Sequence, residues 1–270
     1  MAGLNPFGLQ SANQLAYPAG RSFGFNPTHF ASQGIALGGS YVASGASVLR
    51  LDAPGSIAIT GSITGLQGPI GPTINVASSS NKITSSGLLV GSSTSFTNAF
   101  IGWIGSTNNR FTPALTPPSY QAVYISSSTP PCPLQMYVDG AGAVIQTTSV
   151  IPANTPVFVV GTANNTTGYI LVVTNLLTGQ IYSFTAAFAR TISAFTGVVS
   201  LLNDNASDYW GTGGVACTML SQANPTLQQL LQWATDPWSF WYTRSPSIAV
   251  ATQATGVTVV PTRTLMGVGV

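Results

Sequence analysis

Residues 208–241 read DYWGTGGVACTMLSQANPTLQQLLQWATDPWSFW, and this stretch decides the fold class of the chain. Three glycines lead into VACTML at 215–220, a run that is rich in strand formers and too short to make a helix. Apolar residues then recur at helical spacing, as one stripe formed by Leu227, Leu230, Leu231 and Ala234. The stretch therefore predicts a buried strand followed by one short helix near 225–233.

Local signals mark both ends of this helix. Asn224 is placed to cap it, and Pro225 suits the first helical position, where a missing N–H does no harm. Pro237 ends it, because the residue before a proline is pushed out of the helical region. We expect Trp238 to pack under the helix and to close one end of a β-sandwich. The other large side chains here are predicted packing residues: Trp233, Phe240 and Trp241.

The composition favours an all-β protein. The 270 residues include 29 Gly and 18 Pro, with no Glu and a single lysine, Lys82. Strand-like runs alternate with turn dipeptides such as Thr167-Gly168 and Thr178-Gly179. The length fits one sandwich of about 200 residues plus tails. We therefore divide the chain into three parts: an N-terminal arm (1–20), a jelly-roll sandwich (21–244) and a C-terminal extension with short β runs (245–270).

Three segments resemble the concanavalin-type, laminin-G-like jelly-roll domains of tailed-phage structural proteins. The first combines Tyr209-Trp210, the strand, the helix and Asp236-Pro237-Trp238. The second is the pair of runs at 156–162 and 165–171, which is similar to the family's hairpin. The third is Gly24-Phe25-Asn26-Pro27-Thr28-His29, which resembles the entry to the first strand. Residues 175–179 depart from the family, since they replace its compact turn.

This resemblance implies a concanavalin-like sandwich of two antiparallel sheets and a role as a structural protein of the virion, assembled in the host cytoplasm. A head decoration protein held by its terminal arms is the first expectation, and a tail or fibre component is the second. A carbohydrate-binding adhesin is the alternative from a different class. The implied partners are the major capsid protein or other virion subunits, and further copies of the chain in a homo-oligomer.

The charge pattern argues against two classes of partner. Charged residues make up 4% of the chain, and the seven basic ones are scattered, so no stripe exists to neutralise nucleic-acid phosphates. No apolar run approaches the roughly 18–20 residues that cross a bilayer. The opening MAGLNP lacks the basic and apolar regions of a signal peptide. We therefore expect neither nucleic-acid nor membrane binding.

The sequence offers little catalytic chemistry, and we expect the protein not to be an enzyme. His29 is the only histidine, and no Gly-x-Ser-x-Gly elbow accompanies it, so a local hydrogen-bonding role is favoured. A glycosidase needs two carboxyl groups. The chain has no Glu and five Asp, of which Asp139 lies in a turn dipeptide and Asp236 in the helix stop.

Metal and thiol chemistry have few candidates. Asp204 and Asp208 lie in an oxygen-rich loop before Tyr209 and are the candidate ligands for calcium, the one cofactor that the sequence suggests. The alternative is that this loop makes only Asx turns. Cys132 lies between two prolines and Cys217 lies mid-strand, so two buried free thiols are expected rather than a disulfide.

Two groups of exposed apolar residues are candidates for binding. Tyr209 and Trp210 lie at a loop-to-strand junction and are candidates for stacking on sugar rings, whereas Trp103 lies inside a strong strand run and is expected in the core. The arm has too few apolar residues, at no fixed period, to fold alone. Its candidates for attachment to a neighbouring subunit are Leu4, Phe7, Leu9 and Tyr17.

Overall fold

The computed structural model of the chain describes most of the expected sandwich. The described residues are 26–32, 35–40, 57–69, 71–75, 78, 80–88, 95–108, 114–115, 121–125, 130–138, 143–187, 189, 191–192, 197–201 and 211–241. The predicted arm at 1–20 and the predicted extension at 245–270 lie outside them, so the predicted division into three parts stays a prediction.

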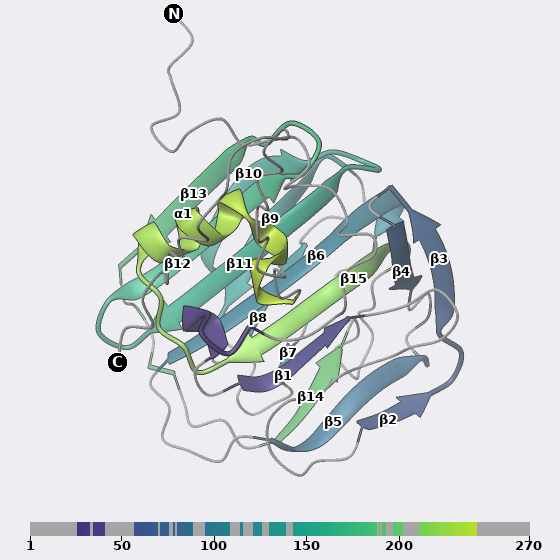
Figure 1. Ribbon diagram of the computed structural model, residues 1–270, viewed down its shortest axis with the longest axis horizontal. Helices are drawn as coiled ribbons and strands as arrows, with labels where there is room; N and C mark the ends of the chain where they lie inside the picture. Colours follow the sequence, from purple (N-terminus) through teal and green to yellow (C-terminus); the bar gives the residue numbers. More distant parts are fainter. Residues whose placement is uncertain are drawn as a thin grey trace, which may run out of the picture.

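Two antiparallel sheets form the body of the molecule (Figure 1). The first sheet has the order β13 (Ile181–Ala186), β12 (Gly168–Asn175), β11 (Pro156–Asn164), β6 (Ser95–Asn108), β15 (Gly211–Ser221), β4 (Gly71–Asn75), β3 (Thr64–Gly68), and β1 (Ile35–Ser40) also pairs with β15. The second has the order β10 (Ala143–Ile151), β9 (Cys132–Tyr137), β8 (Gln121–Ile125), β7 (Ala114–Leu115), β14 (Gly197–Leu201), β5 (Lys82–Leu88), β2 (Ile57–Thr60). The prediction of an all-β sandwich is confirmed.

The main core lies between the two sheets. Along β6 the inward side chains are Phe96, Phe100 and Ile104, which follow the period of two that a strand imposes. Val123 and Met136 face them from β8 and β9. Their burial removes apolar surface from water at about 25 cal/mol per Å² and provides the main stabilisation of the sandwich.

A second core covers the opposite face of the eight-stranded sheet. It is built by α1 (Leu227–Thr235) and the 3₁₀ helix η3 (Pro237–Phe240), which lie across the outside of this sheet (Figure 1). The strand side chains in this core are Ala99, Ile101, Phe158, Val160, Val172, Ala216, Cys217 and Met219. Every residue of β11 is buried, because this strand is covered on both faces, which explains the continuous apolar run at 156–160.

The place of Trp238 corrects one expectation. Trp238 is buried as predicted, at 3% exposure, but it packs in the outer core rather than at an end of the sandwich. The physical reason is the short link between α1 and η3. Only Asp236 separates the last residue of α1 from Pro237, so the chain folds back over the same face of the sheet that α1 already covers.

The helix cap is a second correction. Thr226, not Asn224, is the N-cap residue, so Pro225 lies outside the helix. The amide of Gln229 donates to Thr226 Oγ1 over 3.3 Å, and the Thr226 amide donates to Gln229 Oε1 over 2.8 Å. This reciprocal capping box satisfies two amides that would otherwise lack partners, whereas Asn224 satisfies at most one. At the other end, the Asp236 amide donates to the Trp233 carbonyl, and Pro237 prevents continuation.

The predicted turns are present at both ends of β12. Gly168 has φ 88° and Gly179 has φ 72°, a left-handed conformation that glycine adopts without strain. Before each of them an asparagine side chain organises the turn. Asn164 Oδ1 accepts from the amides of Thr166 and Thr167, and Asn175 Oδ1 accepts from the amides at 177 and 178. The longer turn at 175–179 therefore has its own Asx-stabilised structure.

Gly213 is the glycine whose replacement should be most harmful to β15. Its φ is 115°, and a Cβ added there would lie 2.3 Å from the Trp103 carbonyl oxygen. We expect Gly213→Ala to lower the free energy of unfolding by about 2–4 kcal/mol, because backbone strain and a backbone clash add together. Urea denaturation measures this change. Thr185→Ala, at an exposed strand position, is the control and should shift stability by less than about 0.5 kcal/mol; equal stability of the two variants would refute the expectation.

Candidate functional site

Charged side chains are nearly absent from the described part of the chain, where Lys82 and Asp236 are the only residues charged at neutral pH. Asp236 ends α1, and its carbonyl oxygen accepts hydrogen bonds from the amide and the hydroxyl of Ser239. Within the described ranges, no three His, Cys, Asp or Glu side chains gather as metal ligands would. A catalytic pair of carboxyl groups would therefore have to draw on residues beyond these ranges.

The site residues predicted from the sequence fall outside the described residues. This holds for the calcium candidates Asp204 and Asp208, for the sugar-stacking candidates Tyr209 and Trp210, and for the arm residues Leu4, Phe7, Leu9 and Tyr17. Their assignments stay predictions.

His29 has a structural setting. Its Nδ1 accepts the amide hydrogen of Ala31 over 3.2 Å, which is the local hydrogen bond expected for it. Its ring meets those of Trp233 and Phe240 edge-on, with centroids 4.6 and 5.4 Å away, and lies against Phe30. Burial in this aromatic setting lowers the pKa of His29 from 6.5 to about 4, so the ring is neutral at pH 7. His29 therefore joins the segment 26–32 to the outer core.

The lowered pKa predicts a loss of stability in acid. Between pH 6.5 and about 4 the unfolded chain binds a proton on His29 that the folded chain does not, so stability falls as the pH falls through this window. We expect a loss of roughly 1–2 kcal/mol, discounted from the full shift because the ring is only partly buried. Denaturation curves at pH 7 and pH 4.5 measure it. His29→Gln should remove this share of the pH dependence, and an identical dependence in both proteins would contradict the assignment.

The two cysteines are buried thiols that form no disulfide, as expected. Cys132 belongs to the core between the sheets, whereas Cys217 belongs to the outer core. Burial raises the pKa of the Cys132 thiol to about 11, so almost no thiolate forms at neutral pH. Since the thiolate is the nucleophile, Cys132 is a packing residue rather than a reactive one.

Trp103 is half-buried and spans three strands. It lies on the outer face of β6, and its Nε1 is directed at Thr73 Oγ1 on β4, 3.5 Å away. Glycines provide the space for the ring, because a Cβ on Gly68 or Gly214 would meet Nε1 at 2.3 or 3.1 Å. The ring thus fills the hollow above these two glycines. This packing corrects the expectation that Trp103 lies fully in the core.

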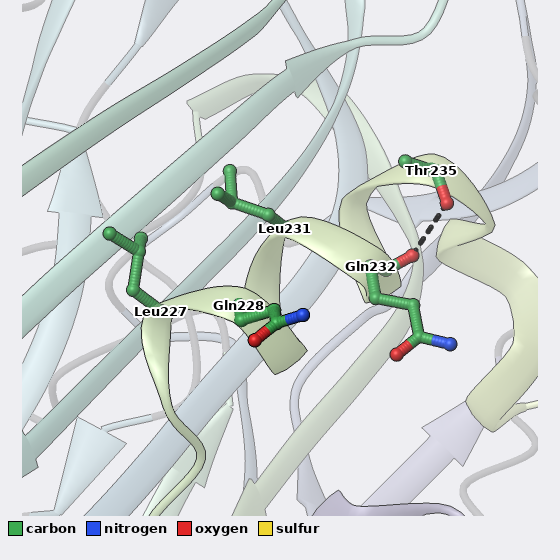
Figure 2. A pocket seen from close by; sticks show the side chains of 5 residues that line it. All are labelled: Leu227, Gln228, Leu231, Gln232 and Thr235. Atoms are coloured by element: carbon green, nitrogen blue, oxygen red, sulfur yellow. Dashed lines mark hydrogen bonds between the residues drawn. The ribbon is translucent and has the colours of Figure 1, made fainter. Parts of the chain in front are cut away.

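The exposed side of α1 borders a pocket of about 680 Å³ (Figure 2). Its described lining consists of Leu227, Gln228, Leu231, Gln232 and Thr235. Figure 2 shows the two leucines projecting together on one side of the helix and the two glutamine amides on the other. We call this lining the α1 groove. It offers apolar surface and neutral hydrogen-bonding groups, and no charge.

The first and last described segments of the chain meet at one place, on the Trp233 side of α1. The Asn26 amide donates to the carbonyl oxygen of Phe240 over 3.1 Å. Asn26 is the first described residue of the chain, and Phe240 lies one residue before Trp241, the last. The N-terminal and C-terminal segments therefore begin from neighbouring points on the outer face of the eight-stranded sheet.

Neither the groove nor this junction was predicted from the sequence. Leu227 and Leu231 belong to the apolar stripe of α1, yet the sheet buries only Leu230 and Ala234 of that stripe fully. The excess width of the stripe is the sequence signal for a further contact on this helix. With nine residues, α1 is far too short to cross a membrane, and no other helix in the described ranges is long and apolar enough to do so.

Comparisons with known proteins support the fold. No protein-family model matches the sequence, and no curated protein matches it either. The binding domain of botulinum neurotoxin serotype D has a similar structure, with a TM-score of 0.54 and 10% identity over 77% of this chain and 52% of that one. The receptor-binding domain of a botulinum neurotoxin C/D mosaic serotype is also similar, with a TM-score of 0.51 and 9% identity over 74% of this chain and 51% of that one.

A third similar structure is an arabinofuranosidase complexed with arabinofuranosyl-alpha-1,2-xylobiose, with a TM-score of 0.50 and 8% identity, over 69% of this chain and 46% of that one. This chain spans about half the length of these three structures. At such low identities the likeness shows a shared β-sandwich fold and nothing about ligand or activity.

Proposed function

We propose that the protein is a non-enzymatic structural subunit of a phage or phage-like particle. The observation that carries the proposal is the scarcity of charge: charged residues make up 4% of the chain, and Lys82 and Asp236 are the charged residues of its described part. A freely diffusing protein relies on surface charge to stay dispersed, whereas a subunit fixed in a particle does not need it. The segments at 156–171 and 209–238 resemble phage structural domains, and this resemblance is the reason for proposing a phage or phage-like particle.

A head decoration protein is the first choice of location, and a tail or fibre component is the second. Both would use the two terminal segments as attachments, with the major capsid protein or other virion subunits as partners and with further copies of the chain. Antibody labelling of purified particles tests the location, since label on the head supports decoration and label on the tail supports the second choice. Particles that carry no label would contradict both.

A carbohydrate-binding adhesin is the alternative function, favoured by the adjacent aromatics Tyr209 and Trp210. The domain of the neurotoxin C/D mosaic serotype, which has a similar fold, is described as receptor-binding, and the arabinofuranosidase was solved with a sugar bound. A glycan array probed with the wild-type protein and with Trp210→Ala separates the two functions. Binding that Trp210→Ala abolishes would favour the adhesin, while the structural proposal predicts no glycan signal in either protein.

A further inference from the structure

The α1 groove is a neutral surface that suits a neutral segment of chain. Its leucines are only half-buried although they pack at the margin of the outer core, so they have apolar area left to cover. The glutamines beside them have exposed or half-exposed amides that can donate to and accept from a peptide backbone. A charged partner would gain no ion pair with the described residues of this lining and would lose hydration. The segment that fits this groove best is therefore one without charge that carries both apolar side chains and side-chain amides.

Residues 1–20 have this chemistry. They read MAGLNPFGLQSANQLAYPAG, with no charged side chain, four large apolar residues at 4, 7, 9 and 15, a tyrosine, and several Asn and Gln amides. The segment 242–270, which starts from the same junction, contains Arg244 and Arg263 and fits the groove less well. The arm is therefore the better occupant of the two terminal segments.

The first described residue, Asn26, lies near the C-terminal end of α1, where the groove ends. Thr235, at the end of the groove, is separated by one residue from η3, and the last residue of η3 is bonded to Asn26. The 25 residues that precede Asn26 reach up to about 80–90 Å when extended. The groove follows a helix only about 14 Å long. The arm thus greatly exceeds the length needed to cover the groove of its own chain, and it is long enough to reach another subunit.

We propose that residues 1–20 of one copy bind in the α1 groove of a neighbouring copy. The helix-bearing face of the eight-stranded sheet is then the assembly face, and the seven-stranded sheet faces away from it. This inference deepens the proposed structural role by naming the surface and its occupant. The arm contributes apolar side chains to Leu227 and Leu231, and its backbone bonds to the glutamine amides.

Disulfide trapping in the full-length protein tests this arrangement. Leu9→Cys in one differently tagged copy is co-expressed with Gln232→Cys in another, and Gln228→Cys provides a second groove position. The native cysteines are buried, so they give little background. Gln146→Cys is the matched control, since Gln146 is an exposed glutamine on β10 of the other sheet. We expect at least about tenfold more inter-chain disulfide at the groove positions than at the control, because docking raises the local thiol concentration.

Each outcome decides a different point. Inter-chain links at Gln232 and Gln228, absent at Gln146, support the proposal. Links no more frequent than the control at both groove positions overturn it. Links that form only when both cysteines are in one chain would show that the arm covers the groove of its own chain. That result would overturn the proposal that the arm binds a neighbouring copy. Because trapping uses purified protein, it can succeed even if the chain is missing from particles. Absence from particles would reject the proposed particle role, whereas the trapped contact between copies would still be supported.

Discussion

Replacement of Trp233 by alanine is expected to lower the free energy of unfolding by about 3–5 kcal/mol, the range for large-to-small changes at fully buried aromatics. Trp233 is 1% exposed and lies at the centre of the outer core, where its ring contacts those of Phe158, Phe240 and Trp241. Its Nε1 donates to the Pro237 carbonyl over 3.2 Å, and that buried acceptor would lose its partner. Urea denaturation followed by fluorescence gives the change.

Gln232→Ala is the matched control on the same helix, because Gln232 is exposed and alanine is a good helix former. It should change stability by less than about 0.5 kcal/mol. The segment 26–32 should also loosen in Trp233→Ala, since His29 and Phe30 pack on the indole. Faster hydrogen exchange at the amides of Ala31 and Ser32 would report this. Wild-type stability in Trp233→Ala would show that the outer core contributes little to the fold.

Deletion of residues 1–20 is expected to release the protein from particles while leaving the sandwich folded. The described sandwich begins at Asn26, so its two cores lose no described side chain. Each 1.4 kcal/mol of lost binding energy lowers affinity about tenfold, and an arm with four large apolar residues supplies more than that. We therefore expect the bound copies to fall at least about tenfold.

Quantitative immunoblotting of purified particles measures the bound copies, and circular dichroism of the truncated protein verifies the fold. The control is a full-length chain with Leu4, Phe7, Leu9 and Leu15 replaced by serine, which keeps the length of the arm and removes its apolar contacts. It should behave like the deletion. If the truncated protein is incorporated at the wild-type level, the arm is not the anchor, and residues 245–270 become the candidate.

Local patterns in the sequence were enough to predict the secondary structure around α1. Helical spacing identified the helix, and the glycines at 168 and 179 identified the turns, because both depend on interactions within a few residues. The cap was assigned wrongly because two local signals competed. Asn224-Pro225 resembles a helix start, but Thr226 and Gln229 satisfy two amides at once and determine the boundary.

The position of the outer core could not be read from the same patterns. Trp238 is apolar and follows the helix, which predicts burial but not the surface that buries it. The one sequence signal for a covered outer face was the continuous apolar run at 156–160 in β11, since a strand with one solvated face alternates. The junction of Asn26 with Phe240 joins residues more than two hundred positions apart, and only the three-dimensional arrangement shows it.

The composition of purified particles tests the central claim most directly. Particles are separated from free protein on a density gradient, and the chain is quantified by mass spectrometry against the major capsid protein. A structural subunit is expected at a fixed ratio to the capsid protein that persists through repeated gradients. A ratio that falls towards zero with each gradient, or particles without the chain, would contradict the assignment as a particle subunit.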